Sequence, residues 1–181
     1  MTVSPFSLGT KILGGGAVLL FGVLALGVVL PTDWEAGASQ VVSAEPDAVY
    51  ALLDSPEGWR AWTAWPDSGL VRSGPERGTG ASITWNDPEL GEGSFRIVEA
   101  VRPEHVRYEV EVSGGAMRTA GTLTLTPIQD GVRVVWREEG NLGRNPLMGY
   151  WGFFMEDAQT AELERSLGRL DEAVSDRARS R

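Results

Sequence analysis

The chain of 181 residues is 42% hydrophobic and 23% charged, which is enough for one domain with a sizeable core and a short appendage. Its net charge of -9 disfavours nucleic-acid binding, because phosphate contacts need a concentrated basic face. The absence of cysteine excludes disulfides, thiol catalysis and cysteine metal sites. We find no motif for a cofactor or a metal, and the sequence does not specify an oligomeric state.

An apolar segment, Ile12 to Leu30, lies near the start of the chain and contains no charged side chain. As a helix it would rise roughly 28 Å, close to the ~30 Å hydrocarbon core of a bilayer. A transmembrane helix is therefore the leading prediction. A cleaved signal peptide is the alternative, because Ala36-Gly37-Ala38 fits a small-x-small cleavage site, although the segment is longer than a usual secretory core.

The charges beside this segment predict its orientation. Lys11 precedes it, and Asp33 and Glu35 follow it, so the positive-inside rule places the N-terminus in the cytoplasm. We expect a single-pass membrane protein with an extracytoplasmic domain. The expected parts are a tail and transmembrane anchor over 1–31, the domain over 32–176 and a charged tail over 177–181.

The soluble part begins with one strand and two short helices. Alternation over residues 34–42 predicts a half-buried strand. Pro46 and Pro56 each lie where proline is tolerated, in the first turn of a helix, and Ser55 is a suitable N-cap for the second helix. Both helices are expected before residue 63.

From residue 80 to 138 apolar and polar residues alternate between turn signals, which predicts a series of antiparallel strands with one apolar face. The segment SFRIVEAV is ambiguous, because Phe95 and Ile97 lie on one face while Val98 and Ala100 lie on the other. The predicted strands are ASITWN (81–86), SFRIVEAV (94–101), VRYEVEV (106–112), TAGTLTLT (119–126) and VRVVWRE (132–138).

A long amphipathic helix is predicted over residues 146–175, because apolar residues recur at helical spacing. The stripe consists of Phe154, Ala158, Ala161, Leu163, Leu167, Leu170 and Val174. The order of elements predicts an α+β fold in which a curved antiparallel sheet grips this C-terminal helix. Bulky rings would hold the helix off the sheet and leave a cavity between them.

Four segments carry a family resemblance. They are SAEPDAVYALLDSPEGWRAWTAW (43–65), Gly78-Thr79-Gly80 before the strand that contains Trp85, Asp130 to Trp136, and LERSLGRLDEAV (163–174). In this order they resemble the START-like helix-grip superfamily (SRPBCC, including polyketide cyclase/dehydrase-like members). The resemblance implies a curved sheet around an apolar cavity. Members include lipid and hormone binders, aromatase/cyclases and chaperone activators, so the fold underdetermines the function.

Glu138 and Tyr108 are the candidate acid/base residues. Continued alternation puts Glu138 on the apolar face, where it could orient a polar ligand group or act as a base if burial raised its pKa. If the strand ends earlier, Glu138 and Glu139 are both solvated. The only histidine, His105, cannot form a standard zinc site without cysteine.

Aromatic side chains are the candidate walls of the cavity, although the same rings could fill it as a dry core. In GWRAWTAW, Trp59 and Trp62 share a helix face and are expected to seal the short helices onto the sheet, while Trp65 precedes Pro66 and leaves the helix. The predicted ligand-binding residues are Trp59, Trp62, Trp85, Tyr108, Leu123, Trp136 and Phe154.

Three functions are compatible with these patterns. The leading hypothesis is a membrane-anchored, non-catalytic domain that binds a hydrophobic or amphipathic, lipid-like small molecule. The second is a cyclase/dehydratase-type enzyme that uses Glu138 and Tyr108, and the third is an envelope protein-interaction module with a filled cavity. The aromatic segment 145–157 suits a lid, a membrane-facing surface or ordinary packing of the helix start.

Overall fold

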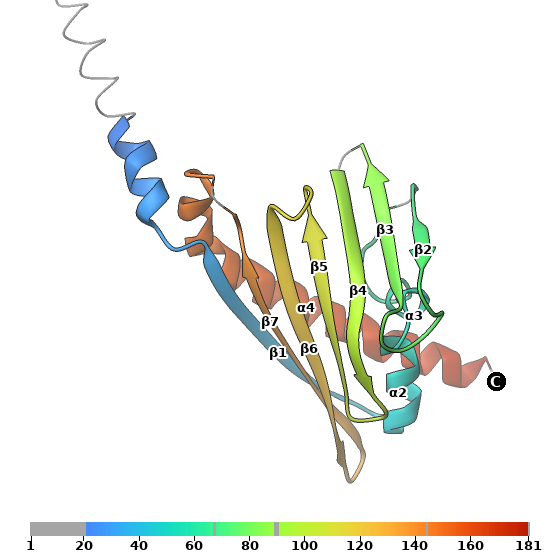
Figure 1. Cartoon of the computed structure of the whole chain (residues 1–181). Coiled ribbons are helices and arrows are strands. Elements are labelled where there is room, and N and C mark those ends of the chain that lie inside the picture. Colours follow the sequence, from blue (N-terminus) through green and yellow to red (C-terminus); the bar gives the residue numbers. More distant parts are fainter. Residues whose placement is uncertain (1–20, 67, 89–90, 144, 181) are drawn as a thin grey trace, which may run out of the picture.

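A seven-stranded antiparallel sheet and one long helix form the domain (Figure 1). The computed structural model describes residues 21–66, 68–88, 91–143 and 145–180. The strands lie in the order β1-β7-β6-β5-β4-β3-β2, so β1 and β2 are the two edges. The bounds are β1 Asp33–Val42, β2 Val71–Ser73, β3 Ser82–Asp87, β4 Gly91–Val101, β5 His105–Val112, β6 Met117–Ile128 and β7 Gly131–Asn141, with helices α2 Pro46–Leu53, α3 Pro56–Trp59 and α4 Met148–Arg179.

The local signals of the sequence produce the expected elements. Pro46 and Pro56 begin α2 and α3, and the hydroxyl of Ser55 accepts a hydrogen bond from the Gly58 amide at 3.1 Å as an N-cap. The predicted antiparallel sheet and long C-terminal helix are confirmed. β2 was not predicted, because three exposed residues are too few to show alternation.

A β-bulge resolves the ambiguous faces of β4. The register with β5 shifts between Ile97 and Glu99, so Val98 is an extra residue on the bulged strand. Phe95 and Ile97 are buried on the inner face, and after the bulge Ala100 also packs against the core opposite Val106. One inserted residue therefore explains why simple alternation failed here.

The last helix, α4, packs along β1 and contacts α2, and it buries only part of the predicted apolar stripe. Leu163, Leu167, Leu170 and Val174 are buried in the core. The first part of the stripe differs from the prediction: Phe154 is 66% exposed, and Ala158 and Ala161 are not buried in the core either. Each of these three residues lies nine positions, or two and a half turns, before a buried leucine, so the three lie on the opposite face of α4 from Leu163, Leu167 and Leu170.

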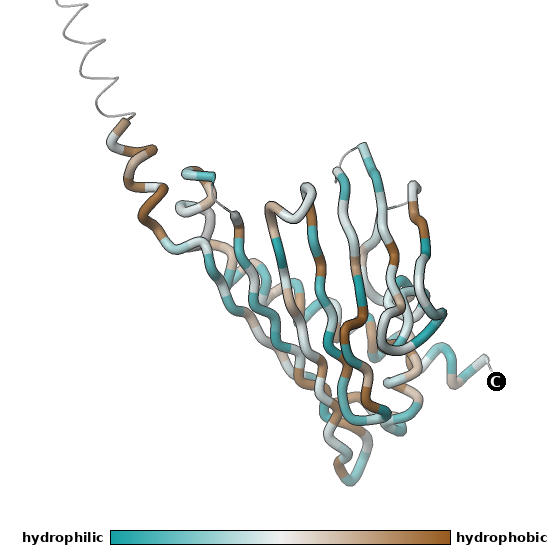
Figure 2. Tube along the Cα trace, viewed as in Figure 1, coloured by the Kyte–Doolittle hydropathy of each residue, from teal (hydrophilic) through white to brown (hydrophobic). Residues whose placement is uncertain are grey.

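The predicted membrane segment Ile12–Leu30 lies partly outside the described residues. Residues 21–29 are helical and largely hydrophobic (Figure 2), and every one of them except the buried Gly27 is exposed. Within the described ranges, no helix is both long and apolar enough to span a bilayer.

Candidate functional site

A cavity of about 430 Å³ lies between the inner face of the sheet, the segment 59–66 and α4. A volume of this size is in the usual range of small-molecule sites, roughly 300–1,000 Å³. Its apolar walls are Trp59, Trp65, Trp85, Phe95, Val110, Val112, Trp136 and Leu163, and its polar groups include Tyr108, Glu138 and Gln159. Several of the rings predicted as walls or filler therefore border open space.

Glycines opposite Tyr108 and Trp85 explain why these large rings leave this space, and Trp34, which does not line the cavity, has the same arrangement. Tyr108, Trp85 and Trp34 each lie directly opposite a glycine on the neighbouring strand, and a Cβ added to that glycine would collide with the ring. Each ring therefore lies flat over the sheet and does not project fully toward α4, as aromatic residues do when they cover strand glycines. The opposing glycines are Gly121 for Tyr108, Gly93 for Trp85 and Gly140 for Trp34.

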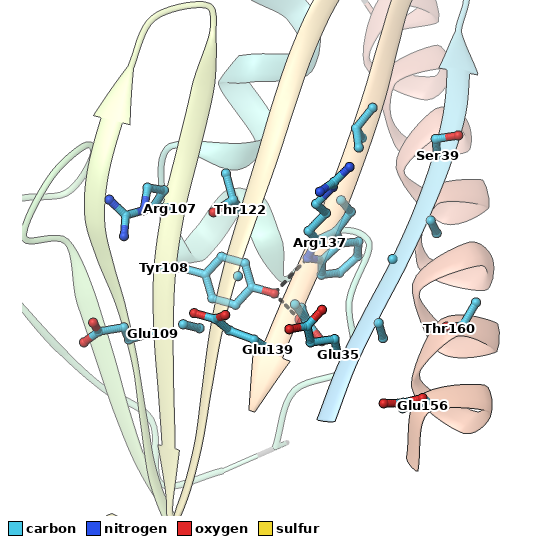
Figure 3. Close-up of a pocket in the computed structure, with 18 of the residues that line it drawn as sticks. Glu35, Ser39, Arg107, Tyr108, Glu109, Thr122, Arg137, Glu139, Glu156 and Thr160 are labelled. Atoms are coloured by element: carbon cyan, nitrogen blue, oxygen red, sulfur yellow. Dashed lines mark hydrogen bonds between the residues drawn. The ribbon is translucent and has the colours of Figure 1, made fainter. Parts of the chain in front are cut away.

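The same geometry assembles a polar network at the inner end of the cavity. Tyr108 of β5, Gly121 of β6 and Glu138 of β7 are neighbours in one row across the sheet. Because Gly121 has no side chain, the Tyr108 ring crosses it, and its hydroxyl donates a hydrogen bond to Glu138 Oε1. Trp136 Nε1 donates to the Tyr108 hydroxyl at 2.9 Å, and Gln159 Nε2 of α4 donates to Glu138 Oε2 at 2.6 Å. Dashed lines in Figure 3 mark the bonds at Tyr108.

Burial sets the electrostatics of this network. Glu138 is 7% exposed, and its donors Tyr108 and Gln159 are neutral. Burial raises the pKa of Glu138 above its ordinary value, and the two hydrogen bonds offset only part of this effect. Burial, together with the adjacent Glu138, raises the pKa of Tyr108 well above its ordinary value. The carboxyl group can therefore exchange a proton at a higher pH than an exposed glutamate, while the phenol stays protonated.

Glu138 occupies the inner face because β7 continues to Asn141, three residues past the predicted strand end. Its neighbour Glu139 is exposed on the outer face, so the two acids do not share one environment. The alternative in which both acids are solvated does not hold.

The tryptophan triplet divides between core and cavity. Trp59 and Trp62 lie with ring centroids 4.8 Å apart, and both are buried. Their indole nitrogens donate to the carbonyls of Leu53 at 2.6 Å and Leu52 at 3.3 Å, so the pair fastens α3 to the end of α2. Trp65 packs against Phe95, with centroids 5.4 Å apart, and lines the cavity.

The predicted binding residues do not all reach the cavity. Trp59, Trp85, Tyr108 and Trp136 line it, whereas Trp62 and Leu123 are buried but are not among its described lining residues. Phe154 also lies outside this lining, because it is on the exposed face of α4, opposite Leu163.

Sequence reasoning missed Trp65, Phe95 and Gln159 as lining residues. The apolar face of β4 was a signal for Phe95. No sequence signal identified Gln159, because the position of its side chain depends on how α4 lies against the sheet.

A second hollow, of about 980 Å³, is lined by residues from both faces of β1, β5, β6 and β7 and by part of α4 (Figure 3), and it shares Tyr108, Trp136 and Glu138 with the first cavity. Its labelled side chains are mostly charged or polar, and include Glu35, Glu109, Glu139, Arg107 and Arg137. Among the described residues, no group of three or more acidic or histidine side chains is placed to hold a metal ion. The cavity beneath α4 is therefore the better site for an apolar ligand.

A curved antiparallel sheet that grips a C-terminal helix around a cavity defines a START-like helix-grip protein. A family model described as polyketide cyclase/dehydrase and lipid transport matches residues 33–175. The chain belongs to this family, and the resemblance seen in the sequence is confirmed.

Solved structures share the fold at low sequence identity. A Staphylococcus aureus protein of unknown function is 10% identical with a TM-score of 0.66, over 83% of this chain and 99% of that one. A Thermus thermophilus protein is 22% identical with a TM-score of 0.60, over 78% and 97%. DynU16, described as a protein in the dynemicin biosynthetic locus, is 14% identical with a TM-score of 0.55, over 78% and 47%. No curated protein matches the sequence significantly.

Proposed function

We propose that this protein is a membrane-anchored binding domain for a small, largely apolar molecule that carries one hydrogen-bonding group. The observation that carries the proposal is the cavity itself: aromatic and aliphatic walls surround the Tyr108–Glu138–Gln159 network at its inner end. Apolar walls supply most of the binding free energy of such sites, and a few polar groups fix the orientation of the ligand. The anchor is the apolar segment Ile12–Leu30.

The cavity limits the size of the ligand. At about 30 Å³ for each water-sized group, 430 Å³ holds on the order of 14 non-hydrogen atoms. A fused-ring alcohol or a short single-chain amphiphile fits this volume, and larger molecules would project from the mouth. The open space also argues against the interaction module, which requires a filled cavity.

Binding of 1-naphthol and 1-methylnaphthalene tests the proposal, because the two ring systems are matched in size and only the first carries a hydroxyl. Residues 32–181 are suitable for this test, since the whole hydrophobic core lies between Val42 and Val174. A hydrogen bond to the Glu138 carboxylate should make 1-naphthol bind at least about tenfold more tightly, as measured by titration calorimetry.

Protonation of Glu138 should control this preference. Ionisation turns the carboxyl into an acceptor, so the preference for 1-naphthol should increase as pH rises through the raised pKa of Glu138. Glu138→Gln should remove the pH dependence, whereas Glu139→Gln on the outer face should retain it. The proposal would be refuted if neither 1-naphthol nor 1-methylnaphthalene bound.

An enzyme is the second candidate, and the Tyr108–Glu138 pair favours it. In a dehydration, Glu138 would take a proton from the carbon next to a carbonyl, and the β-hydroxyl would leave with a proton as water. DynU16 comes from a biosynthetic locus, but its similarity to this chain extends only to the fold. Loss of turnover of a β-hydroxy ketone in Glu138→Gln, with binding retained, would support the enzyme. No turnover by the wild type on such substrates would argue against it.

A further inference from the structure

We infer that the mouth of the cavity faces the bilayer surface, so that the ligand exchanges directly between membrane and cavity. This inference rests on the proposed function. Four observations carry it: the register of the sheet, the attachment of the apolar helix 21–29 to the domain, the short connection to β1, and the exposed apolar side chains at the same end.

The register places the outer part of the cavity at the end of the sheet where the chain enters. Asp33 begins β1 and is in register, across β7 and β6, with Glu111 of β5. Val110 and Val112, which flank Glu111, line the cavity. Tyr108 lies further from this end, so the cavity extends from its polar inner end toward the sheet end beside helix 21–29.

Helix 21–29 packs closely on the first turn of α4. Gly149 lies against the helix so tightly that an added Cβ would be 2.5 Å from the Gly27 carbonyl oxygen and 2.8 Å from Leu30 Cβ. The Tyr150 hydroxyl donates a hydrogen bond to the Val23 carbonyl oxygen at 2.6 Å. These contacts hold the apolar helix in a fixed direction at one corner of the domain (Figure 1).

The connection between this helix and the sheet is short and tied to the end of β7. Thr32 accepts a hydrogen bond from the Leu142 amide at 3.0 Å, and Asn141 Nδ2 donates to Asp33 Oδ1 at 2.6 Å. With so little connecting chain, the end of the sheet must lie near the point where the apolar segment leaves the domain.

The helix at this corner is largely hydrophobic (Figure 2), and its apolar side chains are exposed. On helix 21–29 they are Phe21, Val23, Leu24, Leu26, Val28 and Val29, and nearby on the chain around the start of α4 they are Leu147 and Phe154. A bilayer is the occupant that fits, because this surface continues an uncharged segment of membrane-spanning length. Tyr150 suits the interfacial region of a membrane.

The two ends of β6 supply a matched test on the full chain. The chain has no cysteine, so Ala116→Cys and Gln129→Cys each introduce one labelling site in a turn, at opposite ends of Met117–Ile128. At about 3.3 Å per residue the two sites are roughly 40 Å apart. Each variant is labelled with a fluorophore and inserted into phosphatidylcholine vesicles that contain a lipid spin-labelled at its headgroup.

We expect quenching at position 116 to exceed that at position 129 at least several-fold. Gly149→Leu, which wedges helix 21–29 away from α4 without touching the cavity, should reduce that difference. Equal quenching at both positions, or stronger quenching at position 129, would overturn the inference.

The naphthol titration separates this inference from the proposed function. If residues 32–181 bind 1-naphthol but quenching is the same at positions 116 and 129, only the inference fails. If the labels differ as expected but neither naphthalene compound binds, the orientation stands, whereas the proposed function and direct ligand exchange fail. A full chain that does not partition into vesicles would overturn both the anchor and the inference.

Discussion

Gly121→Ala should damage the domain far more than its single added methyl group suggests. The added Cβ would collide with the Tyr108 ring, so the ring must tilt away from the sheet. Overpacking of this kind costs about 1–3 kcal/mol. Tilting also withdraws the phenol from Glu138 and Trp136, and breaking a buried hydrogen bond costs a further ~1–3 kcal/mol. We expect the free energy of unfolding to fall by about 2–6 kcal/mol in total.

Urea denaturation of residues 32–181 measures this loss, with Gly37→Ala as the matched control. Gly37 lies in β1, where an added Cβ would meet the Trp136 carbonyl oxygen at an ordinary 3.4 Å. The control should change stability by no more than about 0.5 kcal/mol. Equal stability of Gly121→Ala and Gly37→Ala would refute the reasoning.

A double variant shows whether the ring is the cause. In Tyr108→Ala the ring is absent, so the extra methyl group at position 121 has little to collide with. The cost of Gly121→Ala should therefore shrink by at least about 1 kcal/mol in the Tyr108→Ala background. Additive losses would place the damage elsewhere in the sheet.

Two further predictions follow from burial. Because the raised pKa of Glu138 means that the folded state holds its proton more tightly than the unfolded state, stability should fall as pH rises from the unfolded pKa to the folded pKa. Each tenfold difference in proton affinity between the two states is worth about 1.4 kcal/mol of unfolding free energy. Glu138→Gln should abolish this dependence of stability on pH, whereas Glu139→Gln should retain it. Urea titrations that show the same dependence in both variants would contradict the argument. Leu167→Ala, at a fully buried position of α4, should cost about 2–5 kcal/mol, whereas the exposed Glu164→Ala should cost less than about 0.5 kcal/mol in thermal or urea unfolding. Similar losses in both variants would show that α4 does not contribute to the core as described.

The sheet could be predicted from the sequence because one of its faces packs against the core and the other faces water. Alternation identified the inner residues Ile83, Val106, Tyr108 and Val134, which are all buried, and prolines identified the starts of both short helices. Alternation failed to assign the faces where the two-residue period of a strand was interrupted. The bulge at Val98 inserts one residue, and after it the inner face passes to residues of the opposite parity.

The remaining features depend on tertiary geometry that periodicity does not contain. Phe154 follows the spacing of Ala158 and Ala161, yet it is exposed, because nine residues are two and a half helical turns and place it on the side of α4 opposite the buried Leu163. Gln159 reaches Glu138 only because α4, which packs along β1, brings this side chain within reach of the neighbouring strand β7, and no local pattern encodes that placement. The side chains of Trp151 and Phe153 lie outside the described set, so the aromatic segment 145–157 stays a prediction in that part.

A glycine opposite an aromatic ring gives the ring room to lie flat on the sheet and to form a wall of the cavity. A ring opposite a bulky side chain must project into the space beneath the helix, whereas Tyr108, Trp85 and Trp34 lie flat over Gly121, Gly93 and Gly140. Those glycines are visible in the sequence, but their pairing depends on strand register, which turn lengths and the bulge fix together. The same pairing gives Tyr108 its path to Glu138. A relative with a larger residue at position 121 should therefore lack both the flat ring and the buried hydrogen bond, and the cavity and its polar inner end should be lost together.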